Sequence, residues 1–322
     1  MEQRSVGHSG LKVSRLGLGT MTWGRETDAD EAAAQLVAFR DAGGTLVDTA
    51  ATYGYGLAEE LLGQLVADVV PRSELVLATK AGIVRGTESS HVDASRGGLL
   101  RQLDESLRKL GTDYVDLWYV HSVDDTVPFD ETLSALDAAV SSGKTRYVGV
   151  SNYSGWRVAR AGVWQRAVPG RAPLVANQVR YSLVDRGVER EAIPACIELG
   201  IGILPYSPLG GGVLTGKYRS GVPADSRAAA GERPVAGMAR ASTLGIVEAV
   251  ATAAEGLATS PVAVALAWLR ERPGVTAPIL GARTLGQLTA ALASETLDLP
   301  DEIRDALDDV SAPELGYPEN VS

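Results

Sequence analysis

Four side chains suited to proton transfer stand at the ends of three apolar runs of this sequence. Asp48 ends TLVD, Tyr53 follows it, Lys80 ends LVLATK, and His121 ends YVDLWYVH. A phenol has an unperturbed pKa of about 10, so it needs a cationic neighbour that stabilises the phenolate if it is to donate a proton near neutral pH. Lys80 is a candidate for that cation. The pattern therefore predicts acid–base chemistry at a set of neighbouring strand ends.

The elements that must position these residues alternate regularly along the chain. Apolar runs begin near residues 45, 75, 115, 147, 175 and 202, and helical patterns between and after them cover 57–68, 96–110, 130–142, 155–166 and 187–199. This alternation predicts βαβ units and a parallel sheet. In a barrel of such units, the carboxyl ends of the strands carry the chemistry.

The first and last units complete the pattern. RLGLGT (15–20) is the first predicted strand, with a helix following Asp28, and VTAPILG (275–281) is the eighth strand. A doubly wound open sheet would need G-x-G-x-x-G after its first strand, and Gly17, Gly19 and Gly24 do not have that spacing.

Segments outside the regular units are also predicted. Residues 4–14 form a hairpin that turns at His8-Ser9-Gly10, and residues 207–239 form a long loop after the seventh strand. Helical patterns cover 241–256, 261–271, 284–293 and 300–310. The expected fold is one α/β domain over residues 1–322, a (β/α)8 TIM barrel with an N-terminal β-hairpin and extra C-terminal helices.

Composition narrows the possible partners. The 322 residues carry a net charge of −10, which argues against nucleic-acid and anionic-membrane partners. Cys196 is the single cysteine, which is typical of a reducing cytoplasm, and with three scattered His it gives no metal-site spacing. No signal peptide and no membrane-spanning run is found. The expected protein is cytoplasmic, with no metal, either as a monomer or as a small homo-oligomer.

Further motifs accompany the four strand-end residues. They are GLGTMTWG (17–24), GVSN (149–152), YSPLGGGVLTGKY (206–218), SR (226–227) and GARTLGQL (281–288), with Gln178. In this order, over nearly the whole chain, they make the sequence resemble the aldo-keto reductases, NADPH-dependent carbonyl reductases built on a TIM barrel.

The resemblance implies a catalytic tetrad. Tyr53 would protonate the oxygen of an aldehyde or ketone, Lys80 would lower the phenol's pKa, and Asp48 would hold Lys80 charged and oriented. His121 would hydrogen-bond the substrate carbonyl and orient it toward the hydride donor. The alternative is a structural Asp48–Lys80 ion pair with Tyr53 and His121 as ordinary polar neighbours.

The resemblance also implies NADP(H) as cofactor. The residues it assigns to the nicotinamide end are Thr20, Met21, Asp48, Ser151, Asn152, Gln178 and Tyr206. Those assigned to the pyrophosphate are Ser207, Pro208, Leu209, Gly210, Gly212, Lys217 and Arg227, and those assigned to the adenosine end are Gly281, Arg283 and Gln287. Asn152 and Gln178 could instead serve only barrel-rim hydrogen bonds.

Arg283 is a planar cation suited to a ribose 2′-phosphate, which favours NADPH over NADH. Two departures from the family pattern bear on that preference. Leu280 stands where the family often has Pro, and Ala291 stands where it often has an Asn that contacts adenine.

The expected substrate pocket contains Trp23, Tyr55 and His121, with Ile83 and Val84 nearby. Trp118 either lines this pocket or belongs to the core. Ser122 replaces a common tryptophan, which predicts a more open or polar pocket, and His91 is expected in a solvent-facing loop. Two other functions remain open: an NADPH-binding regulatory subunit resembling the potassium-channel β subunits, and a sugar ketoreductase of a biosynthetic pathway.

Overall fold

The computed structural model describes residues 1–86, 89–219, 221, 241–313 and 316. The described residues include eight parallel strands that form one sheet. From the first strand to the seventh, each pairs with the strand that follows it in the barrel, and the first strand also pairs with the last. Ile203 bridges Val275, which brings the two ends of this sheet together. The strands are β3 (Gly17–Gly19), β4 (Leu46–Asp48), β5 (Val76–Ala81), β8 (Val115–Val120), β9 (Thr145–Ser151), β10 (Leu174–Arg180), β11 (Gly202–Tyr206) and β12 (Ile279–Gly281).

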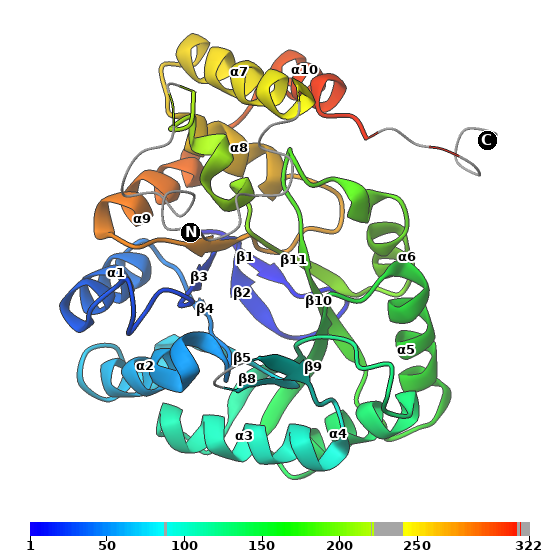
Figure 1. The fold of residues 1–322 in the computed structure, drawn as a ribbon. Coiled ribbons are helices and arrows are strands. Elements are labelled where there is room, and N and C mark those ends of the chain that lie inside the picture. Colours follow the sequence, from blue (N-terminus) through cyan, green and yellow to red (C-terminus); the bar gives the residue numbers. More distant parts are fainter. Residues whose placement is uncertain (87–88, 220, 222–240, 314–315, 317–322) are drawn as a thin grey trace.

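Helices surround this sheet, and Figure 1 looks into the ring that they form. The predicted TIM barrel is confirmed. The helices are α1 (Ala29–Asp41), α2 (Leu57–Asp68), α3 (Arg96–Leu110), α4 (Phe129–Ser141), α5 (Gly155–Ala167), α6 (Ala192–Glu198), α7 (Ala241–Gly256), α8 (Pro261–Arg270), α9 (Leu285–Leu292) and α10 (Asp301–Val310).

Side-chain caps explain where several helices begin. Asp28 accepts a hydrogen bond from the backbone N–H of Glu31 at the start of α1, and Ser95 accepts one from Gly98 at the start of α3. These bonds satisfy donors that the first helical turn would leave without a partner.

One predicted helix is wrong in its extent. The pattern over 187–199 is split into a 3₁₀ turn at Gly187–Glu189 and the short α6. Pro194 is the physical reason, since it has no N–H and its ring would clash with the carbonyl four residues earlier in a continuous helix.

The barrel interior is filled from below by the N-terminal hairpin. Strands β1 (Gln3–Ser5) and β2 (Lys12–Ser14) pair antiparallel as predicted. Val6, Leu11 and Val13 are buried in one cluster with inward residues from around the barrel, among them Leu117 and Tyr119. The lower end of the barrel is therefore closed by packed side chains.

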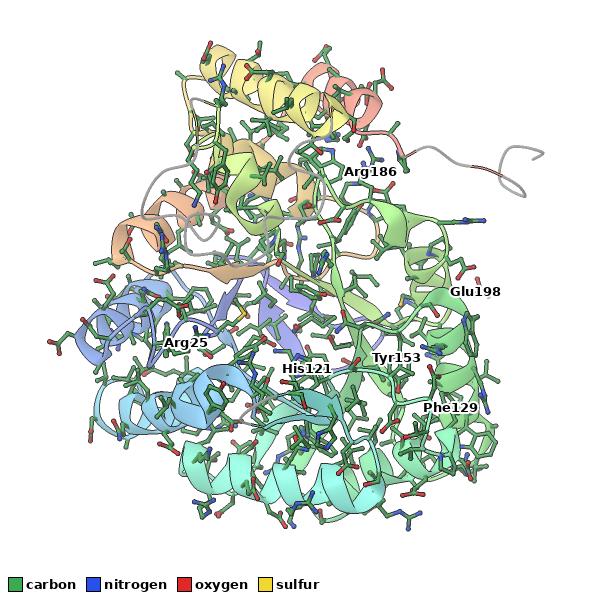
Figure 2. All side chains as sticks on the ribbon, in the orientation of Figure 1. Arg25, His121, Phe129, Tyr153, Arg186 and Glu198 are labelled. Carbon is green, nitrogen blue, oxygen red and sulfur yellow. The ribbon has the colours of Figure 1, made fainter. Side chains whose placement is uncertain are left out.

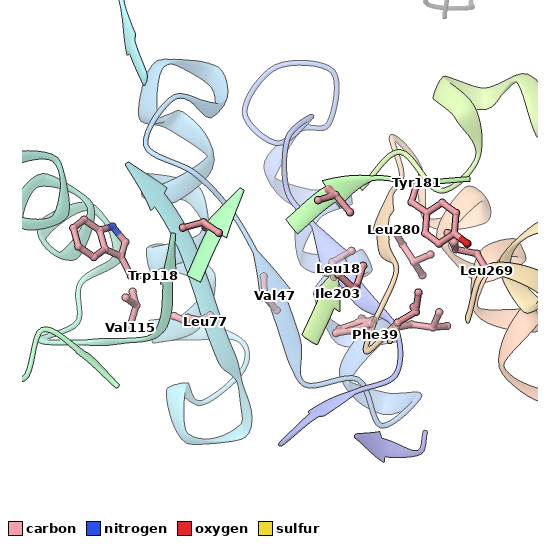
Figure 3. Close-up of a cluster of buried hydrophobic side chains, with 14 of the residues drawn as sticks. Leu18, Phe39, Val47, Leu77, Val115, Trp118, Tyr181, Ile203, Leu269 and Leu280 are labelled. Carbon is pink, nitrogen blue, oxygen red and sulfur yellow. The ribbon is translucent and has the colours of Figure 1, made fainter. Parts of the chain in front are cut away.

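A second, larger cluster lies between the strands and the helices. Figure 3 shows part of it, including Val47, Leu77, Trp118 and Ile203. Because strand side chains alternate between the two faces, Trp118 points outward into this layer while Tyr119 points inward. Trp118 therefore belongs to the core and not to a pocket.

Two connections hold structure that the sequence analysis treats as loop. β6 (Ile83–Arg85) and β7 (Ser90–Val92) form an antiparallel hairpin directly after β5, and His91 lies in β7. After β11, Gly210–Thr215 forms a 3₁₀ segment. Most of the predicted long loop, including Arg227, lies outside the described residues. Across the part of the chain described here, no single helix is long and apolar enough to cross a membrane.

Candidate active site

Lys80 forms the centre of a buried polar cluster at the carboxyl ends of β4 and β5. Its Nζ lies 2.5 Å from Asp48 Oδ2, 2.8 Å from the carbonyl oxygen of Thr49 and 3.1 Å from the hydroxyl of Tyr53. The Lys80 and Asp48 side chains are 1% and 3% exposed. A buried ion pair of this kind is sustained only when its remaining donors find partners, as they do here.

The chain after β4 is bent so that Tyr53 turns back toward Lys80. Backbone N–H groups of Thr49 and Ala51 donate to carbonyls of β5, which extends the pairing past the end of β4. Gly54 and Gly56 then adopt positive φ angles of 58° and 95°. Such angles suit glycine, because it has no Cβ to clash with the backbone.

The charge states of the pair follow from burial and contact. Burial alone would lower the pKa of Lys80, but Asp48 and Tyr53 outweigh it and raise the pKa. For Tyr53, burial raises the pKa, and Lys80 lowers it by less. Lys80 thus lowers the pKa of the phenol, as expected, but burial raises it by more, so the pKa of Tyr53 stays above its ordinary value. The result is a charged lysine beside a protonated phenol.

His121 follows β8 and packs edge-on against Tyr53, with ring centroids 6.2 Å apart and planes at 80°. Figure 2 shows this side chain inside the ring of helices. Burial, with added repulsion from Lys80 and Arg85, lowers the pKa of His121 to about 3. The imidazole is thus neutral near pH 7 and offers one N–H. Its buried Nδ1 has no hydrogen-bond partner within the described residues.

A folding test follows from this neutral histidine. Because the folded state disfavours the charged imidazole, stability is full above the unfolded pKa of about 6.5 and is lost as the pH falls from there toward 3. Between about pH 7.5 and pH 5, we expect wild type to lose about 2 kcal/mol of unfolding free energy that His121→Gln does not lose. Urea titrations at both pH values measure this difference. His91→Gln, at an exposed position, is the control, and equal losses in wild type and His121→Gln would contradict the assignment.

Gln178 reaches the same cluster from the opposite side of the barrel. Its Nε2 donates to Asp48 Oδ1 at 2.8 Å, so Asp48 is held by Lys80 on one oxygen and by Gln178 on the other. The family resemblance assigns Gln178 to the nicotinamide, and its bond to Asp48 is a second role that was not predicted. The pairing joins β10 to β4, and such contacts across a barrel leave no local sequence signal.

The other predicted nicotinamide residues lie at the carboxyl ends of several barrel strands, and one of them, Asn152, contacts His121. Asn152, at φ 62°, donates from Nδ2 to the carbonyl oxygen of His121 at 3.0 Å and accepts from the Tyr206 hydroxyl at 2.9 Å. Ser151 donates to the carbonyl of Gln178. Thr20 is buried against the carbonyl of Asp48. The structure brings these strand-end residues together on one rim.

The segment after β11 is a series of tight turns. Ser207 has a φ of 52°, Gly210 donates to its carbonyl, and Gly212 has a φ of 94°. A Cβ at Gly212 would lie 3.2 Å from Lys217 Nζ, so this exposed lysine lies directly against the turn. Pro208 is buried, Leu209 is partly buried, and Met21 is exposed.

The N-terminus of α9 holds the predicted adenosine-end residues. Thr284 caps the helix, and Gln287 Oε1 accepts the backbone N–H of Arg283 at 2.9 Å. Gly281 ends β12 just before them. Sequence reasoning missed Glu31, whose carboxylate accepts the backbone N–H of Leu285. A carboxylate of α1 thus already lies at the site expected for a phosphate.

The predicted substrate residues separate into two groups. Trp23 is fully buried and donates to Gln35, so it packs in the core and offers no surface to a ligand. Tyr55 is 66% exposed, with the Arg85 guanidinium 5.6 Å from its ring centroid. Ile83 and Val84 are partly buried in β6. No cluster of three or more potential metal ligands is found among the residues with described positions.

Asp48, Tyr53, Lys80 and His121 thus lie together at the carboxyl ends of the strands of a parallel barrel. This arrangement is typical of oxidoreductases built on such a barrel. The family model for the aldo/keto reductase family matches residues 15–312. The chain belongs to the aldo/keto reductase family, whose members generally use a nicotinamide cofactor.

Relatives extend over most of the chain. It is 36% identical to the "Uncharacterized oxidoreductase YrpG" of Bacillus subtilis, with 96% of each chain covered. It is 37% identical to a "Probable voltage-gated potassium channel subunit beta" of Oryza sativa subsp. japonica, with 89% of each covered. It is 35% identical to the "L-glyceraldehyde 3-phosphate reductase" of Escherichia coli K12, covering 89% of this chain and 86% of that one.

Proposed function

We propose that this protein reduces an aldehyde or ketone to the alcohol with NADPH, in a reversible reaction in which Tyr53 is the proton donor. The observation that carries the proposal is the position of Lys80. A charged ammonium 3.1 Å from a protonated phenol stabilises the phenolate that remains after the proton leaves.

Each residue of the cluster has a part in this reaction. Asp48 keeps Lys80 charged, and Gln178 fixes the second oxygen of Asp48. The neutral His121 donates its N–H to the substrate carbonyl and holds it beside the Tyr53 hydroxyl. The bound cofactor supplies the hydride that adds to the carbonyl carbon.

The chemistry of the rim suits such a cofactor. Asn152 accepts a hydrogen bond from the hydroxyl of the partly exposed Tyr206 and donates to Ser151, which donates to the backbone carbonyl of Gln178. Polar groups beside an aromatic ring suit a carboxamide-bearing ring such as nicotinamide. The turns at Ser207–Gly212 and the exposed Lys217 offer backbone donors and a cation to a pyrophosphate. Arg283 at the start of α9 is the cation proposed for the 2′-phosphate.

A panel of small aldehydes and ketones tests the proposal. The purified protein is mixed with NADPH, and the loss of absorbance of the reduced nicotinamide is followed for each compound. We expect turnover with at least some of the simple aldehydes. Tight NADPH binding without turnover of any compound would contradict it.

Binding of NADPH without turnover would point to a different function. The similarity to the rice protein whose name is that of a potassium-channel subunit favours a cofactor-bound regulatory subunit as the second candidate. Stable capture of a membrane partner together with negligible turnover would support this second function. Turnover at ordinary enzymatic rates would favour the reductase.

The cofactor preference gives a further prediction. Arg283→Ala is expected to weaken NADPH binding about tenfold to a hundredfold, because a charged hydrogen bond is worth roughly 1.5–3 kcal/mol, and to weaken NADH binding much less. Fluorescence titration of both cofactors measures the two losses. Equal losses for the two would show that Arg283 does not recognise the 2′-phosphate.

Substituting Glu31 should have the opposite effect on NADPH affinity. Its carboxylate lies at the N-terminus of α9 and competes with a phosphate for the same donors. Glu31→Gln should therefore strengthen NADPH binding more than NADH binding. If both Arg283→Ala and Glu31→Gln leave the NADPH-to-NADH ratio unchanged, the 2′-phosphate is bound elsewhere.

A further inference from the structure

Arg85 is an exposed cation at the mouth of the candidate active site. It ends β6, in the β6–β7 hairpin that continues the chain beyond the carboxyl end of β5, the strand that carries Lys80. Its guanidinium lies 5.6 Å from the centroid of the Tyr55 ring. Tyr55 belongs to the same short turn as Tyr53, so Arg85 is tied to the segment that carries the proton donor.

Arg85 is also close to the second group that would hold a carbonyl. Its positive charge contributes, after burial and Lys80, to the lowered pKa of His121. A substrate held between Tyr53 and His121 would therefore lie in the positive field of this guanidinium.

Arg85 forms no salt bridge with a carboxylate among the described residues. Some surface arginines are paired with acids, such as Arg25 with Glu26 at 3.3 Å and Arg157 with Asp125 at 2.7 Å. Arg85, like Arg146, instead has a ring contact and no ion pair among the described residues. Among the residues with described positions, no ion pair joins Arg85 to an acid, and the only ring contact found for it is with Tyr55. In a chain of net charge −10, an arginine left without an acid beside a catalytic cluster is notable.

The topology separates Arg85 from the segments proposed for the cofactor phosphates. β5 is the third barrel strand, whereas β11 and β12, which lead into those segments, are the seventh and eighth. In a closed ring of eight strands, the third lies opposite the seventh. A cofactor whose phosphates lie over β11 and β12 therefore leaves Arg85 on the substrate side.

The backbone at Tyr55 supports a role for its side chain. Tyr55 has a φ of 59° between two glycines that also have positive φ angles, and its ring is 66% exposed. A side chain in this conformation is strained, and glycine would adopt it without that cost. The exposed ring gives the guanidinium of Arg85 a flat surface on which to rest.

We propose that Arg85 binds an anionic group of the substrate, so that the compounds reduced best by this protein are aldehydes or ketones carrying a carboxylate or a phosphate. A guanidinium offers paired N–H donors that match either group. This inference rests on the proposed carbonyl reductase function and names the class of its substrate.

Matched substrate pairs test the inference. Succinic semialdehyde is compared with butanal, and glyceraldehyde 3-phosphate with glyceraldehyde, so that each pair differs mainly in one anionic group and the two pairs separate carboxylate from phosphate. Wild type should show a higher kcat/KM for the charged member of at least one pair, chiefly through a lower KM. Added salt should reduce this preference, because it screens an exposed cation.

Arg85→Gln should lower the ratio of charged to neutral kcat/KM about tenfold to a hundredfold. Arg85→Lys should retain part of the preference, since it keeps the charge but not the paired donors. Arg146→Gln is the matched control, because Arg146 also stacks on a tyrosine, 4.0 Å from the ring of Tyr114, but lies at the start of β9, at the other end of the barrel. It should leave the ratio at its wild-type value.

Three outcomes overturn the inference: no preference in wild type for either charged compound, an unchanged ratio in Arg85→Gln, or an equal fall for both members of a pair. Calorimetric binding of succinic semialdehyde and of butanal to the cofactor-loaded protein gives a second readout. If wild type turns over neither member of a pair, the reductase function fails, and the anion site is still judged from whether Arg85→Gln weakens the binding of succinic semialdehyde alone.

Discussion

Replacing Tyr53 by Phe is expected to slow carbonyl reduction by about 10²–10⁴-fold, because the variant lacks the proton that the alkoxide must receive. The ring still fits, since only the hydroxyl that contacts Lys80 is removed. Cofactor affinity should therefore be retained. Single-turnover rates with a saturating aldehyde, and cofactor titration by fluorescence, measure the two quantities separately.

Tyr55→Phe is the control for that experiment. It removes a phenol two residues away whose ring is largely exposed and keeps the ring beside Arg85. We expect turnover close to that of wild type. If Tyr53→Phe also turns over at a rate close to that of wild type, Tyr53 is not the proton donor. The cluster would then be a structural ion pair.

Lys80→Met should abolish most activity for a different reason. The phenolate would lose its stabilising cation, and the buried Asp48 would keep its charge with Gln178 as its one remaining side-chain partner among the described residues. Breaking a buried pair by removing one partner typically costs 3–5 kcal/mol of stability. Any residual activity should lose the pH dependence of the coupled Tyr53–Lys80 pair. Urea denaturation and a pH–rate profile measure these two effects.

A double-mutant cycle separates stability from chemistry. Adding Asp48→Asn to Lys80→Met removes the unpaired charge, so the double variant should recover most of the lost stability. Its activity should stay low, because no cation then faces Tyr53. Recovery of both properties would show that Lys80 serves the fold alone, and an unchanged pH–rate profile in Lys80→Met would show the same.

The barrel was predictable because its units repeat. Helices over 57–68, 96–110 and 241–256 have the bounds that their patterns have. For 96–110 the reason is local, since Ser95 caps its start and the left-handed Gly111 ends it. The β6–β7 hairpin was not predictable, because its strands are three residues long and carry no alternation that differs from a loop. The break before α6 is predictable from Pro194, because a proline interrupts a continuous helix over 187–199.

The four predicted catalytic residues meet in space because the carboxyl ends of parallel strands share one rim. Their electrostatic balance could not be predicted in the same way. Whether burial or Lys80 dominates the pKa of Tyr53 depends on how deeply the ring lies, which sequence does not specify. The Gln178–Asp48 bond and the Glu31–Leu285 contact join distant segments, and they follow from the closed barrel as a whole.

The hairpin that closes the lower end of the barrel has a consequence for how the chain is made. Val6, Leu11 and Val13 are buried against Leu46 near the start of the barrel and against Ile279 near its end. Their binding site therefore does not exist until the eighth strand has left the ribosome and the ring has closed. The hairpin, although it precedes every barrel strand in the chain, is therefore among the last parts of the barrel to become buried.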